Sequence, residues 1–383
     1  MHPNAPTERQ SNMELLRIVA MFCIVCFHCS FKSAFIFDEL TPNLFFVKAL
    51  WYLGELGVNL FMLVTGFFLV RGRFKGSKFL LLLCQVLFYW VLTIGIAYAL
   101  GIYTFPEAKR DFVLLFFPTL TGSYWYITAY VVIYALSPWI NSFLKSIGQK
   151  QLIGFIAVLL LFYSITPTVF GFLGEEIEGM LSYTRLVWLF VIYVIGAYIA
   201  LYPPKFLKKI RAMVILCFVN LALMLLFIGL IATSPGFFAK FGVEEWAVFW
   251  PPNTVPMVCL SIGVFGLFLN LRIANNRVIN RIASATLGVY LLHDGVLQGY
   301  IWRTGVFHSS SLVDSAFLVP YILIACILVF SAGIAIDMMR QVLEGITVRP
   351  LLKSAIWKAF VSRGKSRLSS FADKLIEDTD SCK

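Results

Sequence analysis

The chain has 383 residues, of which 60% are hydrophobic and only 13% are charged. Soluble domains usually contain about 45–50% apolar and about 25% charged residues, so this composition excludes an ordinary soluble enzyme. The net charge of +11 would suggest nucleic-acid binding in a soluble protein. Here the basic residues lie in short loops between long apolar segments, which indicates an integral membrane protein in a lipid bilayer with no nucleic-acid partner.

Apolar segments of the length needed to cross a bilayer recur along the whole chain. A bilayer core of about 30 Å is crossed by about 20 helical residues. No polar stretch between the segments is long enough to fold as a separate domain. The sequence therefore predicts an all-α, polytopic integral membrane helical bundle with about ten transmembrane helices. The predicted spans are residues 13–32, 46–70, 78–101, 124–143, 151–170, 183–202, 212–233, 250–270, 282–302 and 315–338.

The ends of the chain and one internal stretch are expected to lie outside the spans. We predict a cytoplasmic N-terminal segment (1–12), a membrane domain (13–340) and a cytoplasmic tail (341–383) that is either solvated or forms a short interfacial helix. The first span lacks the small-residue cleavage site of a signal peptide and is expected to be retained. The stretch 112–121 is too short to cross the bilayer and contains Pro118, so an interfacial or re-entrant piece is expected.

The distribution of Lys and Arg predicts the orientation of the bundle. With the N-terminus in the cytoplasm, 24 of the 31 basic residues fall in cytoplasmic segments and 7 fall on the other side. Cytoplasmic loops carry an excess of Lys and Arg in membrane proteins. An even number of spans with both termini cytoplasmic is therefore predicted.

Ionisable side chains within the spans are the first candidates for function. Each costs roughly 2.5–3.5 kcal/mol at the centre of a membrane helix, so few are retained without a role. They are Glu14, Arg17 and His28 in the first span, Glu55 in the second, His293 and Asp294 in the ninth, and Asp337 near the end of the tenth.

Three of these residues form a polar stripe on the first span. Arg17 and His28 are eleven residues apart, which places them within about 20° of one helix face and about 16 Å apart along the axis. Glu14 lies about 40° from His28 on that face. Such a stripe must face the interior of the bundle or a water-filled cavity. By itself it is explained equally well by structural hydrogen bonding and by catalysis.

Other residues have weaker interpretations. Cys23, Cys26 and Cys29 lie near His28, but their spacing drifts around the helix and no metal site is expected. His293 and Asp294 lie near mid-bilayer, and neighbours on a helix point about 100° apart, so we do not expect them to pair directly. Each either bonds to a neighbouring helix or contacts substrate.

Four sequence blocks, in order between residues 12 and 294, resemble the acyltransferase-3 family of membrane acyltransferases. The blocks are Arg17 and His28 with ten residues between them, Gly57-Val58-Asn59-Leu60-Phe61 with Thr65-Gly66-Phe67-Phe68-Leu69, Trp125-Tyr126-Ile127 with Tyr134 and Leu136-Ser137-Pro138, and Leu287-Gly288-Val289-Tyr290-Leu291-Leu292-His293. The basic stretch Arg71–Lys78 departs from the R-x-x-R pair that many members carry before the third helix.

The resemblance implies transfer of an acyl group, usually acetyl from the co-substrate acetyl-CoA, without a metal. The implied acceptor is a hydroxyl of a cell-surface or capsular polysaccharide or of its lipid-linked precursor, and the implied location is a bacterial plasma membrane. The oligomeric state is left open. We assign catalysis to His28 and Arg17, substrate binding to Glu14, Asn59, Trp125, Tyr126, His293 and Asp294, and binding of the CoA donor to Arg17, Arg71, Arg73, Lys75 and Lys78.

Two questions stay open at the level of sequence. His28 either acts as a general base toward the acceptor hydroxyl or carries the acyl group itself. A glycan transporter or flippase would also contain intramembrane polar residues, although the discontinuous paired spans typical of transporters are not evident. An inactive scaffold is the third alternative.

Overall fold

The computed structural model describes residues 9–37, 41–104, 117–119, 124–172, 184–240 and 251–354. Within these residues every regular element is a helix, as predicted. The chain divides into two units, Met1–Ile334 and Ala335–Lys383. The tail from residue 355 and most of the predicted re-entrant stretch 112–121 lie outside the described residues.

The first unit is an all-helical bundle. Its α-helices are α1 (Ser11–Lys32), α2 (Pro42–Leu69), α3 (Gly76–Ala99), α5 (Trp125–Ser146), α6 (Gln149–Leu160), α7 (Thr166–Phe172), α8 (Arg185–Leu201), α9 (Ile210–Thr233), α10 (Pro235–Lys240), α11 (Val255–Asn270), α12 (Arg277–Ala283) and α13 (Thr286–His293). Two π-helices, η1 (Leu161–Ile165) and η5 (Tyr300–Thr304), and three 3₁₀-helices, η3 (Lys205–Lys208), η4 (Gly295–Leu297) and η6 (Ser309–Leu312), complete it. The long helix α14 (Leu318–Ile346) begins in the first unit and ends in the second, which also contains α15 (Val348–Lys353).

Nine helical segments correspond to nine of the ten predicted spans. Seven are long and apolar enough to cross a membrane, namely α1, α2, α3, α5, Gln149–Gly171, α9 and α14. The shorter apolar helices α8 and α11 account for two more. The outward face of α9 exposes Ile215, Phe218 and Leu226, as expected for contact with lipid. The protein is therefore a multi-pass helical membrane protein, while the count of ten and the cytoplasmic termini remain predictions.

The predicted ninth span, 282–302, is not one continuous helix. Helix α13 ends at His293, and Asp294 has an extended backbone with φ −98° and ψ 178°. Gly295 follows with a positive φ of 76°, which glycine adopts at little cost. The break leaves the carbonyl of Leu291 without its helical partner, and the Tyr124 hydroxyl donates a hydrogen bond to it at 2.9 Å. Such replacement is what permits a broken helix at membrane depth.

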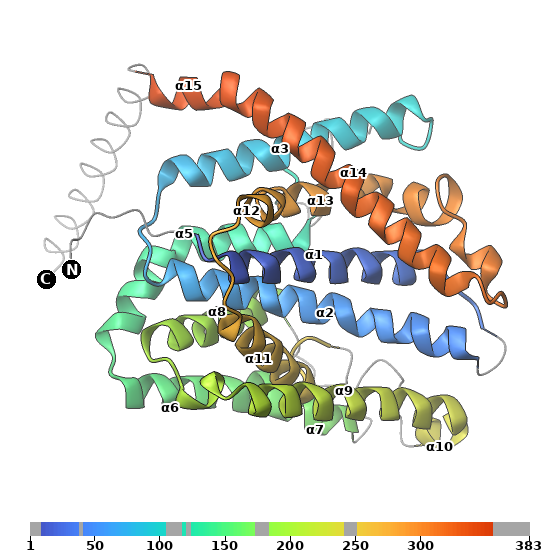
Figure 1. The fold of residues 1–383 in the computed structure, drawn as a ribbon, viewed down its shortest axis with the longest axis horizontal. Coiled ribbons are helices and arrows are strands. Elements are labelled where there is room, and N and C mark those ends of the chain that lie inside the picture. Colours follow the sequence, from blue (N-terminus) through green and yellow to red (C-terminus); the bar gives the residue numbers. More distant parts are fainter. Residues whose placement is uncertain are drawn as a thin grey trace, which may run out of the picture. The chain divides into compact units, whose positions relative to one another are not determined.

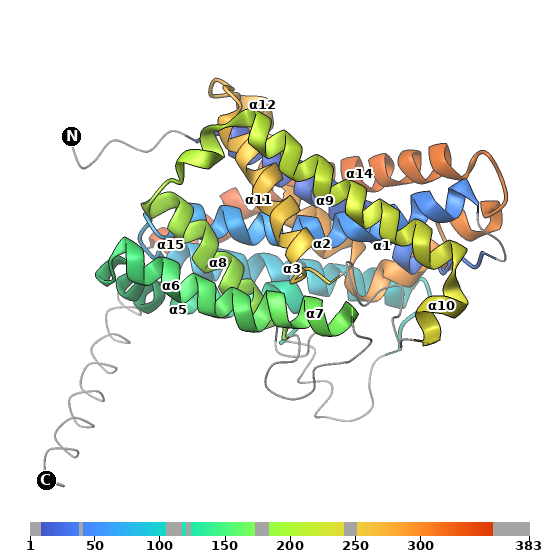
Figure 2. The same ribbon diagram turned by 90° about the horizontal axis from the view of Figure 1, so that it is seen from below.

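Helices α1 and α2 run side by side at the centre of the first unit, with α3 on one side of the pair and α9 on the other in the view of Figure 1. Helix α9 lies beside α11 in both Figure 1 and Figure 2. Helix α8 packs closely on α2 at Gly66 and Gly196, because a Cβ on either glycine would overlap backbone of the other helix. Small residues allow this close approach, which is a common basis of helix packing in membranes.

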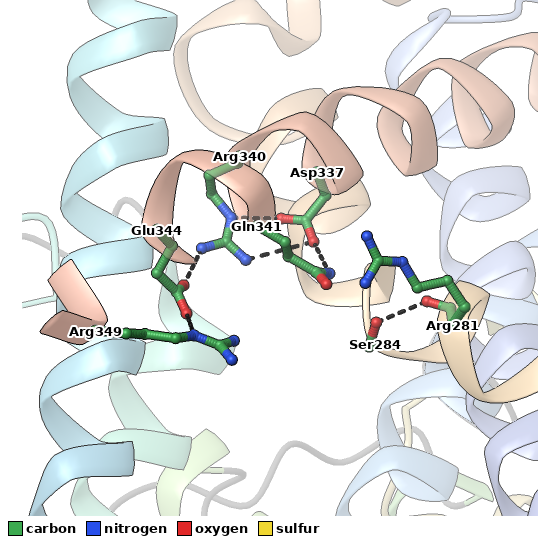
Figure 3. Close-up of polar contacts among 7 residues, drawn as sticks. All are labelled: Arg281, Ser284, Asp337, Arg340, Gln341, Glu344 and Arg349. Carbon is green, nitrogen blue, oxygen red and sulfur yellow. Dashed lines mark hydrogen bonds and ion pairs between the residues drawn. The ribbon is translucent and has the colours of Figure 1, made fainter. Parts of the chain in front are cut away.

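The second unit contains a network of charged side chains at the end of α14 and in α15 (Figure 3). Arg340 donates to Asp337 at 2.7 Å and also pairs with Glu344. Arg349 donates to Glu344 at 2.8 Å, and Gln341 donates to Asp337 at 2.8 Å. The carboxylate of Asp337 is thus balanced locally by a guanidinium, which makes its presence near the end of a membrane helix less costly. Figure 3 also shows a contact within the first unit, where Ser284 donates to the carbonyl of Arg281.

Candidate active site

A cavity of about 1020 Å³ lies inside the first unit. One wall is a single face of α1, where Arg17, Met21, Ile24, His28 and Lys32 follow one another at intervals of three or four residues. Residues at this spacing share a helix face. The cavity therefore follows α1 for most of its length, and two of the three residues of the polar stripe, Arg17 and His28, open onto it. The other walls come mainly from α2, α5, α13 and the segment Pro251–Asn253, with further residues from α3, α7, α8 and α12.

The end of the cavity at the start of α1 is basic. Arg17 and Arg9 both line it. The guanidinium of Arg17 lies 3.2 Å from the carboxylate of Glu14 and 5.7 Å from the centroid of the Phe68 ring. Glu14 contacts the Arg17 side chain but does not line the cavity, so the substrate-binding role assigned to it stays a prediction. Arg9 donates to the carbonyl of Asn280 at 3.0 Å, which connects the N-terminal segment to α12.

A histidine of the cavity wall pairs with a buried histidine from another helix. Nδ1 of His28 lies 2.8 Å from Nε2 of His293, and Nδ1 of His293 lies 2.6 Å from the carbonyl oxygen of Val289. His28 lines the cavity, whereas His293 is completely buried behind it. The sequence did not predict this pair or which of the two nitrogens donates the hydrogen bond, because it identifies no partner for a lone imidazole on the first span.

Asp294 lies on the cavity wall close to the histidine pair. Its negative charge acts on both imidazoles, and its carboxylate lies beside the hydroxyl of Tyr290, which also lines the cavity. The break after His293 explains how two neighbouring residues reach the same place. His293 still points from the last turn of α13 toward His28, while the extended backbone at Asp294 redirects the next side chain into the cavity.

Aromatic side chains and charged groups of both signs also line the cavity. Trp125 and Tyr126 of α5 line it, as do Glu55 of α2 and Arg185 at the start of α8. The guanidinium carbon of Arg185 lies 4.6 Å from the centroid of the Trp125 ring. The sequence identified Glu55 as a costly intramembrane charge but gave it no place in the site. It gave no signal for Arg185, which lies at the start of the predicted span 183–202 and of α8.

Several residues assigned from the sequence lie away from the cavity. Asn59 is completely buried and its amide is fully engaged: it donates to the carbonyl of Pro252 at 2.8 Å and to Ser261 at 3.1 Å, and it accepts from Trp188 at 2.9 Å. These contacts tie α2 to α8, α11 and the segment before α11. The geometry therefore favours a structural role for Asn59 over contact with a substrate.

The basic stretch after α2 is also separate from the cavity wall. Arg71 donates to the backbone carbonyl of Ala200 and lies 5.9 Å from the centroid of the Phe67 ring. Arg73, Lys75 and Lys78 are exposed, and none of the four lines the cavity. The donor-binding role assigned to this stretch stays a prediction.

The arrangement brings together the groups that acyl transfer needs. An imidazole can move a proton to and from reacting groups, and guanidinium groups can bind the phosphates of a donor. A family model described as an acyltransferase domain, Acyl_transf_3, matches residues 10–338, which include every residue of the candidate site except Arg9. No curated protein and no solved structure matches the chain. The chain belongs to the acyltransferase-3 family and is a multi-pass membrane acyltransferase.

Proposed function

We propose that the protein transfers an acetyl group from acetyl-CoA to a hydroxyl of a cell-surface or capsular polysaccharide, or of its lipid-linked precursor, in a bacterial cell membrane. The observation that carries the proposal is one continuous cavity that both Arg17 and His28 line. A donor and an acceptor bound in such a cavity can meet at the imidazole.

The basic end of the cavity suits the donor. A guanidinium binds phosphate oxygens through two parallel hydrogen bonds, so Arg9 and Arg17 are suited to the phosphate groups of CoA. The eleven residues from Arg17 to His28 span about 16 Å of helix, which an extended pantetheine arm can bridge. Arg71, Arg73, Lys75 and Lys78 would attract the anionic donor from a distance without touching it in the cavity.

The aromatic side chains of the cavity suit a sugar acceptor. Binding pockets combine apolar and aromatic walls with a few polar groups that fix orientation. Trp125 and Tyr126 offer such walls, and the carboxylates of Glu55 and Asp294 can accept hydrogen bonds from hydroxyl groups. An acceptor bound against these side chains would place a hydroxyl near His28.

Two routes fit the geometry. In one, His28 takes the proton of the acceptor hydroxyl as its oxygen attacks the thioester carbon, the carbon–sulfur bond breaks, and the same proton passes to the departing thiolate. In the other, His28 attacks the thioester carbon, the carbon–sulfur bond breaks and CoA leaves as the thiolate. The acceptor oxygen then displaces the acetyl group from the imidazole, and the proton of the hydroxyl passes to the thiolate. Both routes end in an O-acetyl ester and free CoA.

The test is acyl transfer by the purified protein in lipid nanodiscs. We expect release of free CoA from acetyl-CoA when a glycan acceptor is present, and matching O-acetyl groups on that glycan by NMR. His28→Ala should abolish both signals, and His308→Ala is the matched control because His308 is an exposed histidine that does not line the cavity. Wild-type rates in the His28→Ala protein would overturn the catalytic assignment. Movement of glycan across the bilayer without CoA release would favour a transporter.

A further inference from the structure

The histidine pair ends on a backbone carbonyl, and this fixes the direction of its hydrogen bonds. A carbonyl oxygen can only accept, so Nδ1 of His293 donates to Val289. In a neutral His293 the other nitrogen, Nε2, is then an acceptor. The group that faces it at 2.8 Å is Nδ1 of His28, which must donate. For neutral imidazoles, Nε2 of His28 is left without a proton.

We infer that His293 is a positioning residue that holds His28 in the tautomer with its proton on Nδ1 and with a free Nε2 facing the cavity. The inference rests on the proposed function, in which His28 is the reactive group. It replaces the substrate-binding role first assigned to His293, because His293 is completely buried and does not line the cavity.

The surroundings of His293 fix the plane of its ring. Trp302 packs edge-on against it with 6.2 Å between ring centroids, and Tyr290 does the same at 6.3 Å. Val289 lies one turn earlier on the same helix and is itself completely buried, so the carbonyl that sets the tautomer is held rigidly. The packing of the helical bundle therefore fixes the ring orientation of His293, the partner of His28. No ligand is needed to fix it.

The tautomer determines which atom of His28 can react. The lone pair on Nε2 accepts the proton of the acceptor hydroxyl, and Nε2 then returns that proton to the sulfur of the leaving CoA. While His28 is protonated, its Nδ1–H still donates to His293, and the charge of Asp294 stabilises the cation. If His28 carries the acetyl group instead, the same free Nε2 makes the bond. Without an acceptor at His293, nothing keeps the proton on Nδ1.

The tautomer of His28 can be measured directly by NMR, without a catalytic assay. The chain has four histidines, so ¹⁵N-histidine solid-state NMR of the protein in lipid, in a His2→Gln and His308→Gln background, reports on the pair alone. We expect His28 to show a protonated Nδ1 and an unprotonated Nε2, and we expect this preference to disappear in His293→Leu. A wild-type His28 with its proton on Nε2 would overturn the inference.

The kinetics of two His293 variants test whether catalysis depends on the tautomer of His28. Gln can place an oxygen where the Nε2 acceptor was, whereas Leu cannot accept. We expect His293→Leu to lower kcat by about 10²–10⁴-fold, the range seen when general acid–base function or the tautomer of a catalytic histidine is lost. The KM for acetyl-CoA should stay within about 3-fold, and His293→Gln should recover kcat to within about 10-fold of wild type. Equal losses in both variants, or losses mainly in KM, would show a merely structural role.

The outcomes separate this inference from the proposed function. If His28→Ala is inactive and His293→Leu turns over at the wild-type rate, the inference fails and the proposed function stands. If His28→Ala is fully active, the assignment of His28 as the reactive group fails. If the wild-type protein releases no CoA from acetyl-CoA in the presence of a glycan acceptor, the proposed function fails, while the NMR result still decides the tautomer. Where His293→Leu does not fold, as judged by thermal unfolding, the wild-type spectrum and the Gln variant still decide.

Discussion

The two segments that supply the histidines are built in opposite ways. Helix α1 is continuous and spaces its functional groups along the helix axis, with Arg17 and His28 eleven residues apart on one face. The segment from α13 to η5 is broken after His293, and two neighbouring residues approach one point from different directions. A continuous helix suits a long, extended ligand such as an acyl-CoA. A break suits a compact cluster of functional groups. Consecutive side chains of a helix point about 100° apart, and a break removes this constraint.

The comparison is tested most severely by moving the imidazole on α1 by one position. We expect the exchange His28→Cys with Cys29→His to lower kcat by about 10²–10⁴-fold, because the imidazole turns about 100° away from the cavity and from His293. The exchange leaves the composition unchanged. Initial rates of CoA release measure it, and the thermal unfolding midpoint shows whether the fold is kept. Activity near wild type in a folded protein would mean that catalysis does not require the imidazole on the face of α1 that lines the cavity.

The second prediction tests whether acetyl-CoA extends along α1 as far as Arg17. Arg17→Gln should raise the KM for acetyl-CoA by about 10–100-fold, since hydrogen bonds to charged groups contribute about 1.5–3 kcal/mol. The effect should be much smaller with acetyl-pantetheine, a donor that lacks the nucleotide and its phosphates. Arg17→Lys keeps the charge without the bidentate geometry and should lie between the two. Equal losses with both donors would place Arg17 at the reaction rather than at the phosphates.

The contrast also explains what the sequence could and could not predict. The shared face of Arg17 and His28 follows from helix geometry alone, and the structure places both on one cavity wall. The break after His293 is not visible in an apolar window that reads as one span, because it depends on a positive φ at Gly295 and on the Tyr124 hydroxyl from another helix. The hydrogen bonds of Asn59 could not be predicted for the same reason, because its three partners come from distant segments.

The third prediction concerns the break after His293, in the segment from α13 to η5. Gly295→Ala should lower stability by about 1–2 kcal/mol, because a side chain at positive φ is strained. The added Cβ would also lie 3.2 Å from the Tyr124 ring. We expect kcat to fall by about 10-fold, the effect of shifting the histidine pair and Asp294 by a fraction of an ångström.

The control for this variant lies four residues further along. Gly299→Ala has φ in the helical range and open space around the new Cβ, so stability and kcat should stay near wild type. Thermal unfolding and rates of CoA release measure both variants. If the two behave alike, the conformation of the break has no special role in the site.

The smallest expected effect concerns the basic stretch after α2, which lies outside the cavity wall although its charge matches that of Arg17. Arg73, Lys75 and Lys78 are exposed, so their attraction for an anionic donor is long-range and screened by salt. The triple change to Gln should raise the KM for acetyl-CoA by about 2–3-fold at low ionic strength and leave it unchanged at about 0.5 M salt. The effect of Arg17→Gln should persist at that salt concentration, because direct bidentate contacts in an enclosed site are screened much less. A large, salt-independent rise in the triple variant would instead place these side chains in contact with the donor and extend the donor site beyond the cavity.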